Sequence, residues 1–289
     1  MKKVTKLMLA LALPAALLAG GNAYAVKITQ WDYENQFGFT ANTGTGVITT
    51  STTNTHPTFA LGSAPANPAF GGATTLQWGT PATASGQSRF RLSDSTGIPT
   101  DGKLVGTVNT DGAFVPDLSL FHDNFVITGT SLTSATLTGA LLLNALVPAT
   151  GDEVGPLVGT FKILFKETPN AGTAGVCADG APRPCPDIFV IDQAASTPLT
   201  NIALGTIDGF SYFLDLDISG LSAVGPESCA AVGQAFPCFG FITQENRTSS
   251  LNIQFRIRSE GGVVPEPGVL ALLGLGLAGI GFGQIRRRK

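Results

Sequence analysis

Charged side chains are scarce in this 289-residue chain, where Asp, Glu, Lys and Arg together make up 13% of the residues. Long amphipathic helices usually carry many Glu, Lys and Arg residues, so this scarcity argues against an α-rich protein. Glycine is abundant, with 36 residues, and phenylalanine is also frequent for an aromatic residue, with 18. Because glycine favours turns and aromatic residues favour strands, the composition predicts strands joined by turns.

The chain also lacks a surplus of positive charge away from its ends. Of the 17 Lys and Arg residues, three lie within the first six positions and four lie at Arg286, Arg287, Arg288 and Lys289. Of the 20 Asp and Glu residues, only Glu266 accompanies these C-terminal cations, so ten cations and 19 anions remain between the two ends. Nucleic-acid binding needs a basic surface, so we predict no nucleic-acid partner. An acidic body suits a protein that stays soluble outside the cell.

Residues for catalysis are few. The chain has two histidines, His56 and His122, and no Gly-x-Ser-x-Gly sequence that would mark a serine hydrolase. Gly274, Gly276 and Gly279 fit a dinucleotide-binding spacing, but they lie in an apolar stretch with no preceding strand. We therefore predict that the protein is not an enzyme and that it needs neither a cofactor nor a metal ion.

Two ligand-binding alternatives stay open. Asp215 and Asp217 share one face of a predicted strand, about 7 Å apart from the rise per residue, and could bind Ca²⁺ or act as acid and base. The simpler interpretation is a solvated strand face. Aromatic residues could also form a sugar-binding platform, although burial in the core is the favoured interpretation. The candidates are Trp31, Tyr33, Trp78 and Phe239.

The first 25 residues have the three parts of a secretory signal peptide. Lysines are followed by an apolar run at residues 7–18 and then by Ala23-Tyr24-Ala25. The small residues Ala23 and Ala25 predict cleavage after Ala25, which would make Val26 the first residue of the mature chain. The alternative is an uncleaved membrane anchor. Secretion machinery and signal peptidase are the partners that this segment implies.

The cysteine pattern agrees with export. Four cysteines form two close pairs in the sequence, Cys177 with Cys185 and Cys229 with Cys238. An even number of cysteines outside the cytoplasm predicts disulfides. Four cysteines allow three pairings, and we favour the two local ones. A zinc site is the alternative, but the spacing does not fit and neither histidine is close in sequence.

Four segments alternate between apolar and mostly polar side chains with a period of two, which predicts half-buried strands. These segments are residues 88–92, 161–166, 210–219 and 251–258. The last has the firmest register, because a slip by one residue would bury Arg256 and Arg258.

Weaker signals complete an all-β prediction. Further strands are expected at residues 26–31, 46–50, 75–78, 103–108, 125–128, 132–137 and 187–191, and a separate, fully buried strand at residues 140–146. Residues 193–203 and 226–234 each have room for a short helical turn. About ten or more short strands predict one antiparallel β-sandwich or jelly-roll-like body at residues 26–259.

The remaining segment, residues 260–289, has a distinct organisation. Pro265, Glu266 and Pro267 precede an uncharged stretch at residues 268–285, and the basic cluster of residues 286–289 follows. The stretch has about the length of a single transmembrane helix, and the cluster is its expected cytoplasmic flank. The segment resembles the PEP-CTERM sorting signal of Gram-negative bacteria. This resemblance implies an exosortase as partner, processing near residues 265–267, and a link to exopolysaccharide and biofilm.

The body resembles the THxN family of PEP-CTERM proteins over most of residues 28–259. The resemblance rests on Trp31-Asp32-Tyr33, Leu76-Gln77-Trp78-Gly79, His122-Asp123-Asn124, Glu167-Thr168-Pro169-Asn170, Cys185-Pro186-Asp187-Ile188-Phe189-Val190 and Cys238-Phe239-Gly240-Phe241-Ile242-Thr243. Phe121 stands where the family has threonine, so only His122 and Asn124 of its naming motif are present. A hydrogen-bonded pair that stabilises a turn is their simplest interpretation.

These observations predict an exported, non-enzymatic protein. The C-terminal helix would hold it briefly in the inner membrane before an exosortase sorts it to the cell surface or extracellular matrix. A carbohydrate-binding module that acts on the exopolysaccharide is the alternative function.

Overall fold

The computed structural model describes residues 26–47, 53–54, 72–94, 103–168, 177 and 185–261. The predicted signal peptide and the predicted transmembrane helix lie outside these residues. The fold described below is the compact unit formed by Ile28–Ile207 and Ser211–Glu260. Two large antiparallel sheets and one small sheet make up its architecture.

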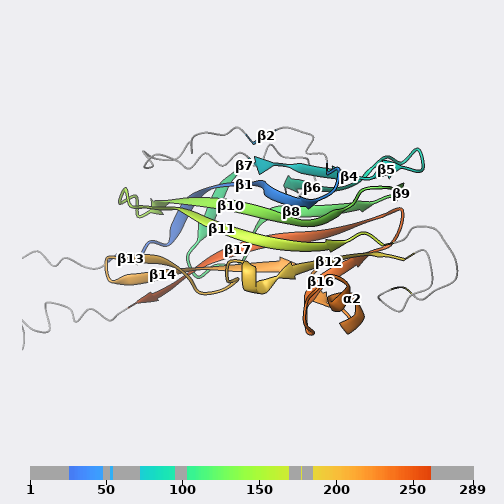
Figure 1. Cartoon of the computed structure of the whole chain (residues 1–289). Coiled ribbons are helices and arrows are strands. Elements are labelled where there is room, and N and C mark those ends of the chain that lie inside the picture. Colours follow the sequence, from blue (N-terminus) through green and yellow to red (C-terminus); the bar gives the residue numbers. More distant parts are fainter. Residues whose placement is uncertain are drawn as a thin grey trace, which may run out of the picture. The chain divides into compact units, whose positions relative to one another are not determined.

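The larger sheet has the strand order β15-β16-β12-β11-β10-β1-β3-β2, with β7 also paired to β1. Figure 1 shows its long strands β1, β10 and β11 side by side. Its strands are β1 (Gln30–Gly44), β2 (Thr53–Asn54), β3 (Gly72–Ala73), β7 (Lys103–Asn109), β10 (Leu132–Val147), β11 (Glu153–Lys166), β12 (Asp187–Asp192), β15 (Ser222–Ala223) and β16 (Phe239–Thr243).

The second sheet has the order β13-β14-β17-β8-β6-β4, and β5 pairs with β9 in the small sheet. These strands are β4 (Thr75–Trp78), β5 (Thr80–Pro81), β6 (Ser88–Asp94), β8 (Val115–Asn124), β9 (Ile127–Thr128), β13 (Ile202–Ile207), β14 (Phe210–Ser219) and β17 (Arg247–Gly261). Helical structure consists of η1 (Gln193–Ala195) and α2 (Pro226–Ala231). Among the residues that the structure describes, no helix has the length and apolar character needed to cross a membrane.

The core lies between the two large sheets. Both sheets contribute inward-facing apolar side chains, such as Phe37, Leu137 and Phe165 from one sheet and Phe90 and Leu120 from the other. Alternate residues of each strand point inward, so the apolar residues that recur with a period of two in the sequence form the core between the sheets. The architecture is therefore an antiparallel β-sandwich, which confirms the predicted fold class.

Most predicted strands are present, but several boundaries differ. The four alternating segments all lie in strands, namely β6, β11, β14 and β17. Residues 132–137 and 140–146 were predicted as two strands, yet they form the single strand β10, because Thr138 and Gly139 pair with β1 and β11 without interruption. Residues 46–47, 125–126 and 26–29 lie outside strands. Several observed strands have no counterpart in the prediction, namely β2, β3, β5, β8, β13, β15 and β16.

The disulfide prediction is confirmed. Cys177 bonds to Cys185, and Cys229 bonds to Cys238. The second bridge is buried beside Ile188 and Val190 of β12, so it joins the α2 region to the sheet. In Figure 1, α2 lies beside β12 and β16.

Asp215 is not on a solvated face, which corrects the simpler of the sequence interpretations. Its Oδ2 accepts hydrogen bonds from Arg258 Nε at 2.6 Å and Arg256 Nε at 3.1 Å, while the Asn201 backbone N–H donates to Oδ1 at 3.0 Å. Asp215 is buried and Asp217 is exposed, so the two carboxylates do not act as a pair. The Arg258 hydrogen bond is the main cause that lowers the pKa of Asp215 to about 2.

We expect the variant Asp215→Asn to be less stable than the wild type at neutral pH only. A carboxylate whose pKa falls on folding stabilises the fold above its unfolded pKa, and this contribution is lost as the pH drops from about 4 to about 2. The partly exposed arginines reduce the effect, so we expect a loss of about 1–2 kcal/mol at pH 7. Urea unfolding at pH 7, 4 and 2 measures it. Asp217→Asn is the matched control, and a difference that persists unchanged at pH 2 would contradict the assignment.

Candidate functional site

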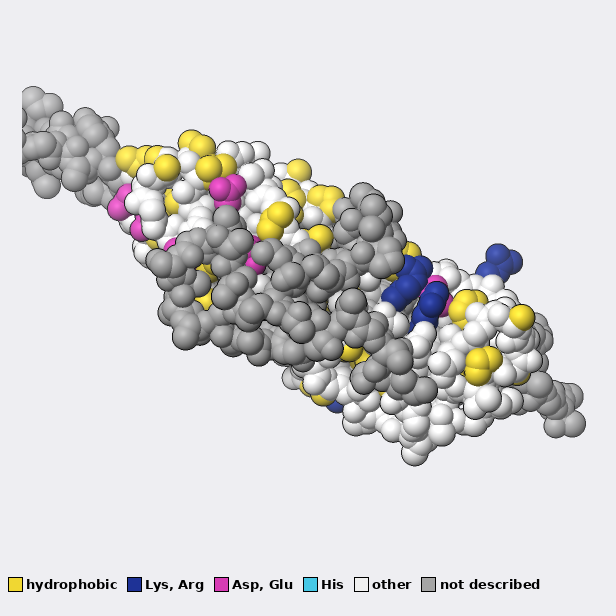
Figure 2. Space-filling model, turned by 90° about the horizontal axis from the view of Figure 1, so that it is seen from above, with side chains coloured by type: hydrophobic (Ala, Val, Ile, Leu, Met, Phe, Trp, Pro, Cys, Tyr) yellow, Lys and Arg dark blue, Asp and Glu magenta, His cyan; other side chains and the backbone are white. Residues whose placement is uncertain are grey.

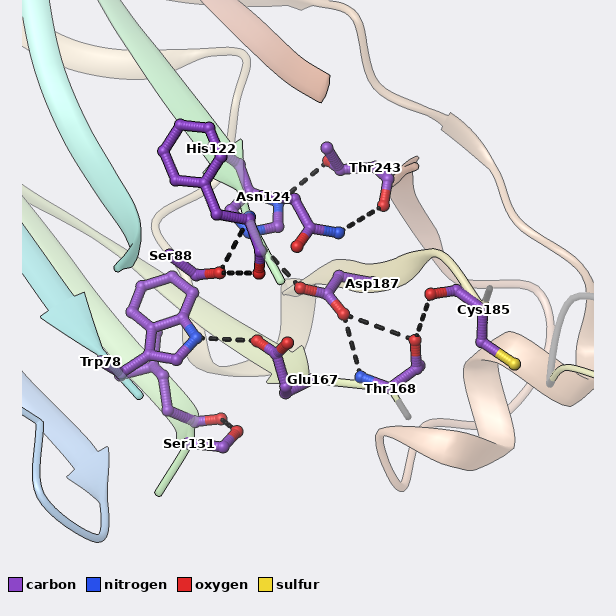
Figure 3. Close-up of polar contacts among 12 residues, drawn as sticks. Trp78, Ser88, His122, Asn124, Ser131, Glu167, Thr168, Cys185, Asp187 and Thr243 are labelled. Atoms are coloured by element: carbon purple, nitrogen blue, oxygen red, sulfur yellow. Dashed lines mark hydrogen bonds and ion pairs between the residues drawn. The ribbon is translucent and has the colours of Figure 1, made fainter. Parts of the chain in front are cut away.

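A cluster of buried polar side chains lies between the two large sheets at one end of the sandwich. Sheet pairing brings it together: Asp187 at the start of β12 pairs with Thr243 at the end of β16, and Glu167 follows the end of β11. His122 and Asn124 come from β8 of the opposite sheet. Figure 3 shows these side chains converging from both sheets. Glu245 lies in the turn between β16 and β17.

Asp187 lies at the centre of this polar cluster. Its Oδ1 accepts the Thr168 backbone N–H at 2.9 Å, and its Oδ2 lies 3.6 Å from His122 Nε2. The Thr168 hydroxyl donates to the carbonyl of Cys185 at 2.7 Å, so the first disulfide loop helps to position this end of β12. Asp187 Oδ2 has no hydrogen-bond partner, although Asp187 is completely buried.

His122 is held as a neutral imidazole. Its Nδ1 lies 2.9 Å from Thr243 Oγ1, and its ring is enclosed by Trp78, Phe90 and Phe165. Burial lowers the pKa of His122 to about 3, so the ring and Asp187 do not form an ion pair near neutral pH. In the tautomer that donates Nδ1–H to Thr243, Nε2 presents a lone pair toward Asp187.

Asn124, beside His122, also forms a hydrogen bond with Thr243 and also has a buried polar atom without a partner. Its Nδ2 donates to the backbone carbonyl of Thr243 at 2.9 Å, and its buried Oδ1 has no hydrogen-bond partner. In Figure 3 this oxygen points toward Asp187. Both Glu245 carboxylate oxygens are buried without a hydrogen bond as well. Burial raises the pKa of Glu245 to about 7, the charge of Glu167 adds to this, and Asn124 opposes it.

Glu167 links this cluster to the aromatic core. Its Oε2 accepts the indole N–H of Trp78 at 2.8 Å, and Figure 3 shows it between Trp78 and Asp187. One carboxylate oxygen from each of Glu167, Asp187 and Glu245 lies within 4.8 Å of the others. Burial raises the pKa of Asp187 well above its usual range, and the charge of Glu167 contributes further. The cluster therefore concentrates acidic groups where water is largely excluded.

A second buried carboxyl group lies elsewhere in the sandwich. Asp117 lines an apolar cavity with Phe37, Leu137 and Phe255, and its Oδ2 accepts a hydrogen bond from Asn35 Nδ2 at 2.6 Å. Burial raises the pKa of Asp117 to about 7. Apart from Asn35 and Asp117, most of the residues that line the cavity are apolar, so it shows no convergent set of polar groups like that around Asp187.

The residues predicted to be functional do not lie together in the structure. His122 and Asn124 lie in strand β8 and form hydrogen bonds with Thr243, the last residue of β16 before the turn to β17. Trp31, Tyr33 and Trp78 are buried in the core, whereas Phe239 is 36% exposed. The predicted cleavage residues, the residues 265–267 and the basic residues 286–289 lie outside the part of the chain that the structure describes.

Three acidic residues of the cluster were not predicted to be functional. Glu167, Asp187 and Glu245 are far apart in the sequence and none belongs to a recognisable spacing motif. Glu167 and Asp187 occur within stretches already noted for family resemblance, together with Trp78 and Thr243. That these stretches meet at one end of the sandwich was not apparent from the sequence.

Comparison with known proteins gives a single result of functional significance. Residues 263–288 match the PEP-CTERM protein-sorting motif. This match supports an exported protein that an exosortase processes. No curated protein matches the chain.

Removal of the Thr243 hydroxyl should destabilise the protein. In Thr243→Val, His122 Nδ1 loses its partner in a fully buried place, which we expect to cost about 1–3 kcal/mol of unfolding free energy. Chemical denaturation monitored by tryptophan fluorescence measures the cost. Thr206→Val is the control, because Thr206 is exposed on a strand and should change stability by less than about 0.5 kcal/mol. Equal midpoints for the two variants would show that this hydrogen bond contributes nothing.

Proposed function

We propose that this protein is a non-enzymatic component of the cell surface or extracellular matrix of a Gram-negative bacterium. Export through the secretion machinery is followed by removal of residues 1–25 by signal peptidase. The stretch at residues 268–285 then holds the chain in the inner membrane until an exosortase acts near residues 265–267. The observation that carries this proposal is the sorting motif at residues 263–288.

Two properties of the body agree with this route. Both disulfides are of the kind that persists in oxidising compartments outside the cytoplasm. The excess of acidic over basic residues in the body favours solubility and disfavours adhesion to other polyanions such as nucleic acids. An association with exopolysaccharide and biofilm is the setting that the sorting signal suggests.

The buried cluster supports a structural role for the body better than a hydrolytic one. Thr243, His122 and Asp187 lie in an order that resembles a hydroxyl–imidazole–carboxylate triad. All three side chains are completely buried, however, and burial lowers the pKa of His122 to about 3, which makes it a poor general base. A substrate could not reach the hydroxyl without separation of the two sheets.

Carbohydrate binding is the second candidate function, and it rests on two exposed aromatic side chains. Phe236 is 60% exposed and Phe239 is 36% exposed, on either side of Cys238. The burial of Trp31 and Trp78 removes the larger candidates for a sugar platform. On the face shown in Figure 2, exposed hydrophobic side chains lie in several separate groups.

Sorting is tested by the intact mass of the protein in cells with and without an active exosortase. We expect the released protein to lack Arg286, Arg287, Arg288 and Lys289 in exosortase-positive cells, and the full tail to remain in the membrane fraction of exosortase-deficient cells. Glu266→Ala should reduce release severalfold, whereas Glu260→Ala, outside the motif, should not. Released protein that still carries residues 286–289 in exosortase-positive cells would refute the proposal.

Glycan binding distinguishes the two candidate functions. A matrix component without lectin activity should give no specific signal on a glycan array when the naturally released protein is applied. A carbohydrate-binding module should give a signal that falls at least tenfold in Phe236→Ala/Phe239→Ala, because stacking on an aromatic ring contributes about 1 kcal/mol or more per ring at a partly desolvated site. The control Val105→Ala changes another exposed apolar residue.

A further inference from the structure

Four side chains of the polar cluster, Asp187 among them, present buried oxygen or nitrogen atoms that no hydrogen bond satisfies. These atoms are His122 Nε2, Asn124 Oδ1, Asp187 Oδ2 and both carboxylate oxygens of Glu245. His122, Asn124 and Asp187 are completely buried. A buried polar group without a partner costs about 1–3 kcal/mol, and a charged group costs more, so such a concentration calls for a ligand.

All of these atoms carry lone pairs that can coordinate a cation. Carboxylate and amide oxygens are acceptors, and the imidazole Nε2 is an acceptor when Nδ1–H donates to Thr243. Carboxylate oxygens of Glu167, Asp187 and Glu245 lie within 4.8 Å of one another, and their like charges repel unless a cation or protons neutralise them. Arg89 and Arg91 do not neutralise these carboxylates, because both form salt bridges with Asp123.

We propose that His122, Asn124, Glu167, Asp187 and Glu245 form a binding site for one divalent transition-metal ion, of the Mn²⁺ or Zn²⁺ type, between the two sheets. Imidazole nitrogen favours transition metals over Ca²⁺ and Mg²⁺, whereas several carboxylates and an amide oxygen favour hard ions such as Mn²⁺. The combination of one nitrogen with several oxygens therefore selects a transition metal that accepts both.

Two sets of separations, His122 to Asp187 and the three carboxylates to one another, bear on a shared ion. Metal–ligand bonds of about 2.1 Å place neighbouring ligand atoms about 3 Å apart and opposite ligand atoms about 4.3 Å apart. His122 Nε2 and Asp187 Oδ2 are 3.6 Å apart, which is too long for a hydrogen bond and suitable for two ligands of one ion. One carboxylate oxygen from each of the three acidic residues lies within 4.8 Å of the others, so these oxygens would have to move closer together to share one ion with His122 and Asn124.

The groups behind the proposed ligands are already in place. Thr243 orients both His122 and Asn124, one through its hydroxyl and one through its backbone carbonyl. Thr168 fixes Asp187 through a backbone N–H, and Trp78 fixes Glu167 through its indole N–H. Such second contacts normally fix the tautomer and direction of metal ligands. Glu167 and Thr168 also line a surface hollow beside the polar cluster.

The full chain, purified and freed of metal with EDTA, is titrated separately with MnCl₂, ZnCl₂ and CaCl₂ at neutral pH. Bound metal is counted by mass spectrometry after gel filtration, and Tm is recorded at each concentration. We expect one Mn²⁺ or Zn²⁺ ion per chain and a Tm that rises with ion concentration, because the ion binds the folded state. Ca²⁺ at the same concentrations should give neither result.

Two variants locate the ion. Glu245→Gln and Asp187→Asn each remove a negative charge with little change of shape, and both should weaken ion binding at least tenfold. Asp217→Asn makes the same chemical change on an exposed strand face and should bind the ion as the wild type does. Because Glu245 lies in a partly exposed turn, Glu245→Gln decides the matter if Asp187→Asn does not fold.

Three results would overturn the proposal. A folded wild type that retains no Mn²⁺ or Zn²⁺ and shows no rise in Tm would mean that protons alone neutralise the carboxylates. Equal ion affinity in Glu245→Gln and Asp217→Asn would place the ion elsewhere on the chain. Binding of Ca²⁺ alone would exclude His122 as a ligand.

Discussion

The contact of Phe90 with both sheets is the interaction on which the rest of the sandwich depends. Its ring lies 5.0 Å from Trp78 and 5.1 Å from His122 within its own sheet, and 5.2 Å from Phe165 and 5.6 Å from Phe189 in the opposite sheet. Edge-to-face contacts of this kind add to the free energy of apolar burial. The rings also exclude water from His122, and this exclusion lowers the pKa of that residue to about 3.

The same aromatic layer explains why the neighbouring polar groups must satisfy one another. Once the sheets close, Asp187 and Asn124 have no access to bulk water, so each needs a partner from the protein or a ligand. Thr168 and Thr243 supply some of these hydrogen-bond partners, through the backbone N–H of Thr168 and the backbone carbonyl of Thr243. The polar atoms of Asp187 and Asn124 that remain without a hydrogen bond belong to one cluster between the sheets. The closing of the two sheets therefore accounts both for the packing of the core and for the chemistry of the polar cluster.

Much of the fold could be predicted from the sequence, but the cluster could not. Alternation at residues 251–258 determines a strand and its register, since the reverse register would bury two arginines. Strand β8 was missed because Pro116 and Asp117 at one end and Asp123 and Asn124 at the other are typical of turns. The acidic residues of the cluster come from separate strands and a turn, and only the antiparallel pairing of β11, β12 and β16 brings them together. Local pairing of the cysteines was one of three possibilities until the structure placed Cys177 beside Cys185.

The polar cluster also constrains when the protein reaches its final state. Its side chains belong to different sheets, so they meet only when the sandwich closes, and uncompensated charge opposes that closure. On the proposed route the body functions outside the cytoplasm, where the proposed cation would be bound. The disulfide Cys177–Cys185 forms under the same conditions and, through Thr168, helps to hold Asp187 in place. On the proposed route, export would thus precede both disulfide formation and uptake of the proposed cation at this end of the fold.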